Sequence, residues 1–145
     1  MLLNFAKLVE WPKPWRPYFI VGVIGRDPFG YVLDETIDGR SVNGRPLMLR
    51  KLVNLEDAGD CDLVFIGMSK RTPARDVVGA VKSHPVLTVS ELPGFLGVGG
   101  MIRIFEEEGR VRFELNAAAA ESANLHFRSQ MLDMLRRSGR RAEGN

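Results

Sequence analysis

Few residues in this chain have side chains that commonly carry out catalysis or bind metals. The 145 residues include two histidines, His84 and His126, and one cysteine, Cys61. A zinc or haem site would therefore need an unusual set of ligands. The sequence also has no G-x-S-x-G motif, no Cys-His pair and no H-E-x-x-H motif. We expect no metal site, no cofactor and no catalytic residues.

A glycine-rich stretch suggests a phosphate-binding loop, but its context argues against one. A P-loop needs Gly-Lys-Ser/Thr leading into a helix, and a dinucleotide-binding loop needs a strand before it and a helix after it. Here Gly99 and Gly100 lead into an alternating apolar run that is typical of a strand. We expect these glycines to allow close approach of two backbones at a sheet edge.

Glu114 is the carboxylate with the most unusual position. It lies in an alternating apolar strand, two residues before Asn116. Its side chain either lines a cleft or simply faces outward, and the sequence leaves both open. A single carboxylate with only Asn116 nearby does not amount to a catalytic pair, so we expect that the protein is not an enzyme.

The composition indicates one globular domain. A chain of 145 residues can bury one normal core. Its net charge of +2 requires neither nucleic acid nor an anionic membrane as partner. No apolar run approaches the roughly 20 residues of a membrane-spanning helix. We expect a single domain over residues 1–137 and a disordered basic tail over residues 138–145.

Apolar periodicity predicts strands and helices in alternation. Continuous apolar runs are typical of strands buried on both faces, and they occur at residues 18–24 and 63–66. Residues 86–89 predict a further buried strand, and residues 47–52 predict another strand. Apolar stripes predict helices at residues 2–9, 74–81 and 129–135. Asp27-Pro28 and Thr72-Pro73 each combine a capping residue with a proline, which predicts helix starts.

This order predicts an α/β fold with a mostly parallel sheet flanked by helices. Two alternating runs, residues 101–105 and 111–115, are joined by an acidic turn and predict an antiparallel hairpin. We expect this C-terminal hairpin at one edge of the sheet, with Asn116 opening an alanine-rich helix after it.

Several short motifs together resemble the YfiR-like family. The matching segments are residues 4–12 (NFAKLVEWP), 24–30 (IGRDPFG), 61–69 (CDLVFIGMS), 85–116 and 129–132 (SQML). Each motif alone is weak, but five in the same order and spacing cover nearly the whole chain. The resemblance implies a periplasmic repressor that binds the periplasmic sensor region of a membrane-anchored diguanylate cyclase and lowers its cyclic-di-GMP output. It also implies a homodimer.

Two departures from the family pattern are informative. Relatives carry further residues and a signal peptide before the position of Met1, so we expect the native precursor to be exported to the periplasm. Many relatives also pair the cysteine at the position of Cys61 with one in the first strand, where this chain has Gly22. That disulfide cannot form here, and Cys61 is expected to be a buried thiol next to a vacant space.

The hairpin and the helix after it are our candidate partner surface. A repressor needs an apolar patch with a polar anchor, and the residues we expect to provide it are Ile102, Ile104, Phe113, Glu114 and Ala120. Together they would form a shallow groove for an amphipathic helix. The alternative for the apolar members is that they simply fill the core.

A second hypothesis is a sensor module that binds a small metabolite. The residues expected to line its pocket are Gly99, Gly100, Glu114 and Asn116. This hypothesis predicts saturable ligand binding by the isolated protein, and both functions hold together if the ligand alters repression. We expect neither nucleic-acid binding nor direct membrane insertion.

Overall fold

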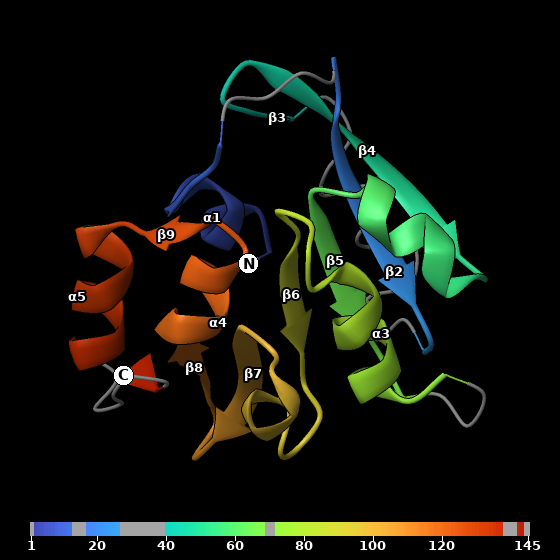
Figure 1. The fold of residues 1–145 in the computed structure, drawn as a ribbon. Coiled ribbons are helices and arrows are strands. Elements are labelled where there is room, and N and C mark those ends of the chain that lie inside the picture. The colour runs from blue at the N-terminus through green and yellow to red at the C-terminus, as the bar shows by residue number, and fades with distance from the viewer. Residues whose placement is uncertain (1, 13–16, 27–39, 69–71, 138–141, 144–145) are drawn as a thin grey trace.

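The computed structural model describes residues 2–12, 17–26, 40–68, 72–137 and 142–143 (Figure 1). Its helices are α1 (Leu2–Lys7), α3 (Ala74–Val81), α4 (Ala117–Ser122) and α5 (Ser129–Arg137), with 3-10 turns η1 (Leu55–Asp60) and η2 (Leu96–Val98). Its strands are β1 (Val9–Glu10), β2 (Phe19–Ile24), β3 (Ser41–Val42), β4 (Arg45–Leu52), β5 (Leu63–Ile66), β6 (Leu87–Ser90), β7 (Ile102–Glu107), β8 (Arg110–Asn116), β9 (His126–Phe127) and β10 (Ala142–Glu143). The helix start predicted at Asp27-Pro28 lies outside the described residues.

One sheet organises the described residues, in the strand order β10-β8-β7-β6-β5-β2-β4-β3. From β4 through β7, every neighbouring pair of strands is parallel. Strands β7 and β8 form the predicted antiparallel hairpin at one side of the sheet, where β10 pairs with β8. The predicted α/β fold with a mostly parallel sheet is therefore confirmed. The predicted disordered tail stays a prediction, because most of residues 138–145 are not described.

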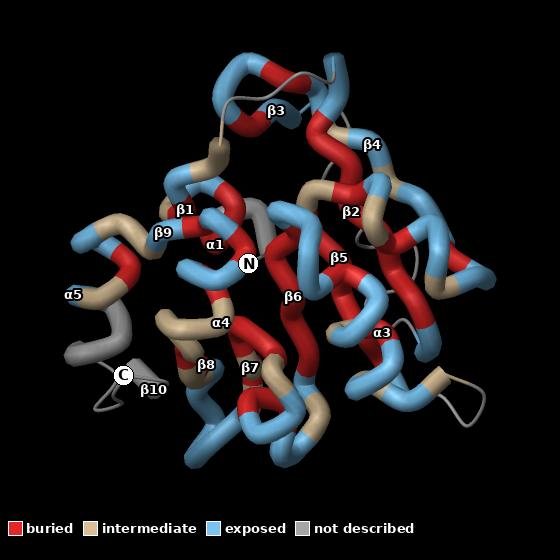
Figure 2. The backbone as a smooth tube through the Cα atoms, in the orientation of Figure 1, coloured by how far each residue is buried: buried red, intermediate tan, exposed pale blue. Residues whose placement is uncertain are grey.

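The central strands are buried on both faces, as predicted from the sequence. All six residues of β2 and all four of β5 and of β6 are buried (Figure 2). Alternate residues of β2 enter two different cores. Phe19, Val21 and Val23 pack in a core with α1 and α4, whereas Ile20 and Ile24 pack in a core with η1 and α3.

A second, two-stranded sheet corrects the prediction for the first helix. The apolar spacing placed Val9 on that helix, but α1 ends at Lys7 and Val9 pairs with Phe127 in the antiparallel β1–β9 pair. The Arg128 amide also donates to the Leu8 carbonyl over 2.8 Å. Val9 is fully buried, and a buried residue at this spacing fits a helix or a strand equally well. Only its distant partner decides between them.

The predicted stripe of α3 is confirmed, but the predicted cap residue is not. Val77 and Val81 are buried on the inner side of the helix. The N-cap position is held by Pro73 rather than Thr72, and Pro73 makes no side-chain cap hydrogen bond. Helix α4 begins as predicted, because the Asn116 carboxamide oxygen accepts a hydrogen bond from the Ala119 amide over 3.1 Å.

Candidate functional site

The glycine turn before β7 allows close packing of its own backbone against an aromatic ring. Gly99 has a φ of 98°, a left-handed conformation that glycine adopts without strain. At Gly100, a Cβ atom would overlap the ring of Phe95, which is buried at 1% exposure. The Gly100 amide also donates to the Phe95 carbonyl over 3.0 Å. The turn therefore fixes the start of the hairpin.

The four apolar residues predicted to contact a partner lie in the core. Ile102 is fully buried, and Ile104, Phe113 and Ala120 are exposed by 7% or less. The ring of Phe113 packs edge-to-face on Phe5 with centroids 5.3 Å apart. The structure thus shows the core role of these side chains, and contact with a partner stays a prediction for them.

Glu114 lies on the opposite face of the hairpin, where it already has a partner. Its Oε1 accepts a hydrogen bond from Nη1 of Arg103 over 3.2 Å, and both side chains are about one-fifth exposed. Arg103 also stacks over the Phe105 ring, 4.7 Å from the centroid. Glu114 is therefore a largely covered member of a charged pair across β7 and β8.

A groove between α3 and α4 is lined by two of the residues predicted to form a pocket. It has a volume of about 500 Å³, and we call it the α3–α4 groove. Of the four predicted pocket residues, Gly99 and Asn116 line it, whereas Gly100 and Glu114 do not. The remaining lining includes Arg75 and Lys82 from the polar side of α3 together with Val78, Val98 and Met101.

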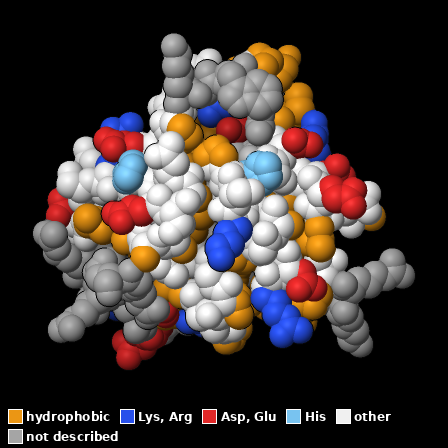
Figure 3. Space-filling view, viewed as in Figure 1, with side chains coloured by type: hydrophobic (Ala, Val, Ile, Leu, Met, Phe, Trp, Pro, Cys, Tyr) orange, Lys and Arg blue, Asp and Glu red, His pale blue; other side chains and the backbone are white. Residues whose placement is uncertain are grey.

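The polar groups at the bottom of the α3–α4 groove hold the fold together. The Asn116 carboxamide nitrogen donates to the Leu96 carbonyl over 3.4 Å, and its oxygen caps α4. The Thr88 hydroxyl accepts from the Met101 amide over 3.0 Å. The polar groups of Asn116 and Thr88 are thus used within the fold, and the surfaces left to contact a ligand or partner are the apolar walls and the basic rim. Figure 3 shows basic and hydrophobic side chains on the face that carries α3 and α4.

Arg75 and Lys82 line the groove but were not among the predicted site residues. The stripe of α3 was assigned to the core, and nothing in a single sequence reports that the polar flank of α3 faces α4. The available signal was the position of both basic residues beside Val78, one turn of helix away on either side.

Cys61 lies where the family comparison placed it, beside Gly22. It is 1% exposed, and its Sγ donates to the Asp57 carbonyl over 3.7 Å. A Cβ atom added to Gly22 would lie 2.7 Å from this Sγ and 2.9 Å from Leu52 Cδ1. The prediction of a vacant space beside Cys61 is therefore wrong, because Leu52 fills it. Gly22 lies in β2, and Cys61 lies two residues before β5, the strand that pairs with β2.

No cluster of histidine, cysteine or acidic side chains suited to a metal ion occurs among the residues that the structure describes. Within the same residues, no helix is long and apolar enough to span a membrane. The described residues thus form an α/β domain with a groove between α3 and α4.

A family comparison gives this domain its class. The chain belongs to the YfiR/HmsC-like family, whose model matches residues 1–136. The family is regulatory rather than catalytic, and membership implies a periplasmic regulator in diguanylate cyclase signalling.

Proposed function

We propose that this protein is a periplasmic repressor. It binds the periplasmic sensor region of a membrane-anchored diguanylate cyclase and thereby lowers cyclic-di-GMP output. The observation that carries the proposal is the match to the YfiR/HmsC-like family over residues 1–136. We further propose that the repressor is exported and acts as a homodimer.

The α3–α4 groove is the proposed contact with the cyclase. It combines apolar side chains, among them Val98 at 43% exposure, with the basic residues Arg75 and Lys82. An amphipathic helix can place its apolar side in such a groove and its acidic residues near the basic rim. Glu114 is proposed as a polar contact at the neighbouring face of the hairpin, in exchange for part of its pairing with Arg103.

Deleting the gene in its native bacterium tests the function directly. Loss of a repressor should raise cellular cyclic-di-GMP, and expression from a second copy should restore the original level. Unchanged cyclic-di-GMP after deletion would contradict repression. Fractionation of the tagged native precursor tests export, and light scattering of the purified protein tests the dimer.

Substitution of two exposed valines tests whether the groove, rather than another part of the surface, contacts the cyclase. Val98→Asp introduces a charge into the α3–α4 groove, whereas Val53→Asp introduces one at an 85% exposed site outside it. Both variants should keep the melting temperature, because neither residue is part of the core. Val98→Asp should prevent copurification with the cyclase, and Val53→Asp should not. Equal binding by both variants would exclude the groove as the contact.

Ile102 is unsuitable as a residue for testing the contact by substitution. This side chain is fully buried, and its truncation to alanine should cost about 2–5 kcal/mol of stability. Loss of binding would then report loss of folding.

Metabolite sensing is the second candidate function, and the size of the α3–α4 groove favours it. A volume of about 500 Å³ lies within the usual range for small-molecule sites. Ligand binding would raise the melting temperature of the isolated protein in a concentration-dependent way. A screen of anionic metabolites with an apolar part, matched to Lys82 and Val78, should reveal such a shift in the wild-type protein and a smaller one in Lys82→Gln.

A further inference from the structure

The order of the parallel strands creates a second position suited to a ligand. In the sheet, β2 lies between β4 and β5, so the chain leaves β2 toward one side and leaves β5 toward the other. In open parallel sheets, ligands bind outside the carboxyl ends of the strands at the point where the direction of winding reverses. Here this point lies at the carboxyl ends of β2 and β5.

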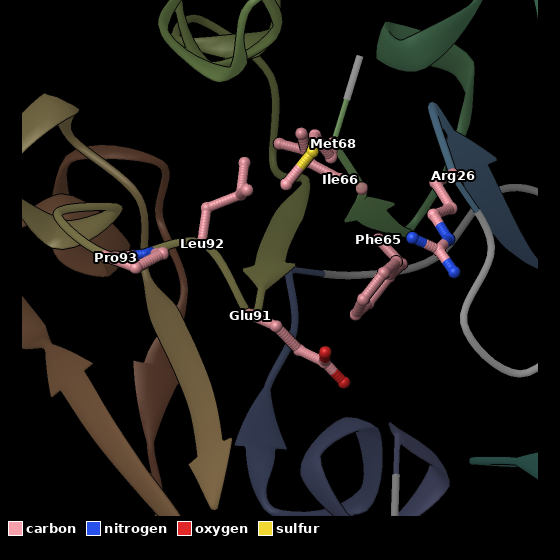
Figure 4. Close-up of a pocket in the computed structure, with 8 residues that line it drawn as sticks. Arg26, Phe65, Ile66, Met68, Glu91, Leu92 and Pro93 are labelled. Atoms are coloured by element: carbon pink, nitrogen blue, oxygen red, sulfur yellow. The ribbon is translucent and has the colours of Figure 1, made fainter.

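A pocket of about 430 Å³ lies at this point (Figure 4). It is formed where β2, β5 and β6 end, and it shares no lining residue with the α3–α4 groove. We call it the strand-end pocket. Its lining includes Arg26, Phe65, Met68, Glu91 and Leu92. Its volume is within the range of small-molecule sites.

Hydrogen bonds hold the first two strand ends in place. The Gly67 amide donates to the Ile24 carbonyl over 2.8 Å, and the Arg26 amide donates to the Met68 carbonyl over 2.9 Å. A Cβ atom on Gly67 would overlap the Arg26 carbonyl oxygen, so only glycine permits this contact.

The end of β6 is held in the same way. The buried hydroxyl of Ser90 donates to the Ile66 carbonyl over 2.6 Å and accepts from the Leu92 amide over 3.1 Å. The wall of the pocket is therefore formed before any ligand arrives, which lowers the entropic cost of binding.

Two residues of opposite charge, Arg26 and Glu91, line this pocket without forming an ion pair with each other. Figure 4 shows the Arg26 and Glu91 side chains on the same side of the strand ends as Phe65. Both residues are exposed, and within the described part of the chain neither side chain forms an ion pair. Because β5 lies between β2 and β6, the two backbones are two strand spacings apart, or about 10 Å.

This spacing selects the length of the ligand. We infer that the strand-end pocket binds short, unblocked peptides of about three residues, with the carboxylate at Arg26 and the ammonium group at Glu91. An extended peptide spans roughly 3.3–3.6 Å per residue, so about three residues cover 10 Å. A free amino acid spans only about one third of the distance between the two backbones. Met68, which is 66% exposed, and Leu92 supply apolar contact for a peptide side chain.

Titration of the ¹⁵N-labelled full chain with the tripeptide Ala-Leu-Ala tests this inference. Saturable chemical-shift changes are expected at the amides of Arg26, Gly67 and Glu91. N-acetylated and C-amidated Ala-Leu-Ala should each bind about two- to fivefold more weakly, the effect of losing one solvent-exposed ion pair. Free leucine should cause no saturable change. Equal binding by all four ligands, or no saturable change with Ala-Leu-Ala, would overturn the inference.

Two charge-removing variants fix the orientation of the peptide. Arg26→Gln and Glu91→Gln should each weaken binding of unblocked Ala-Leu-Ala by the same two- to fivefold. Glu91→Gln should leave binding of the N-acetylated peptide unchanged, because that peptide has no ammonium group to lose. Arg50→Gln, at an exposed position of β4 outside the pocket, is the matched control and should bind like the wild type. Independent effects of peptide blocking and residue substitution would contradict the assigned contacts.

Discussion

The two ends of the same parallel strands use one arginine and one acidic residue in opposite ways. At the amino ends of β2, β4 and β5, Arg45 and Asp62 meet at 3.3 Å with side chains only 9% and 13% exposed. At the carboxyl ends, Arg26 and Glu91 are exposed and stand on either side of a pocket. The first pair is a nearly buried contact at one end of the sheet. The second pair leaves both charges exposed to solvent.

The surroundings of Arg45 and Asp62 explain why that pair is structural. Asp62 accepts a further hydrogen bond from the Ile20 amide over 2.8 Å. Arg45 donates to the Tyr18 carbonyl over 3.2 Å and lies over the Phe19 ring at 5.2 Å. Each contact satisfies a charge that would otherwise be buried alone. Distance and burial, rather than residue type, therefore separate a stabilising pair from a binding pair.

Removing one charged side chain from each end of the strands should give the largest difference in unfolding free energy between two variants. Asp62→Ala leaves the buried Arg45 without its carboxylate and should cost about 3–5 kcal/mol of unfolding free energy. Glu91→Ala, at the exposed end, should change stability by no more than about 0.5 kcal/mol. Urea denaturation of both variants measures the difference. Equal losses would mean that the two ends do not differ in the way their burial indicates.

A crosslink at the amino end should stabilise the protein by a smaller amount. In Gly22→Cys, the new Cβ would lie 2.7 Å from Sγ of Cys61, so a disulfide can form once the flexible end of Leu52 moves aside. The oxidised variant should be about 2–4 kcal/mol more stable than its reduced form. Thiol titration should find no reactive thiol after oxidation. Two remaining thiols would exclude the pairing, and peptide binding at the carboxyl end should not change.

Most of the fold could be predicted because its elements have local signals. The runs that form β2 and β5 are apolar throughout, and such runs are typical of a sheet covered on both faces. The β1–β9 pair had no such signal. Each strand has two residues, and the two strands lie more than a hundred positions apart in the chain.

The candidate sites were harder to predict, for two physical reasons. Alternating residues such as Ile102 and Phe113 have the same pattern in a core and at an interface, and only the packing of α1 and α4 shows that they are buried. The strand-end pocket depends on the order of strands in the sheet. Arg26 and Glu91 are 65 positions apart in sequence, and nothing local brings them together.

The glycine contact at the carboxyl end should be sensitive to a single methyl group. Gly67→Ala places a Cβ against the Arg26 carbonyl oxygen and should cost about 1–3 kcal/mol, because the two strand ends must move apart. It should also weaken binding of Ala-Leu-Ala. Gly79→Ala is the matched control, since a Cβ there meets no atom within 4 Å. In the helical position of Gly79, alanine should stabilise the protein by about 0.5–1 kcal/mol. Thermal denaturation should show a lower melting temperature for Gly67→Ala and a higher one for Gly79→Ala than for the wild type.

The Arg103–Glu114 pair lies between the two extremes and should give the smallest effect. Its 3.2 Å contact matches the distance at the amino end, but its side chains are 22% and 23% exposed. Glu114→Gln keeps the shape and removes the charge, so it should cost about 0.2–1 kcal/mol, less at high salt. Urea denaturation at two salt concentrations measures this. A loss as large as that of Asp62→Ala would show that contact distance alone determines the strength of these pairs, because burial is the property in which the two pairs differ.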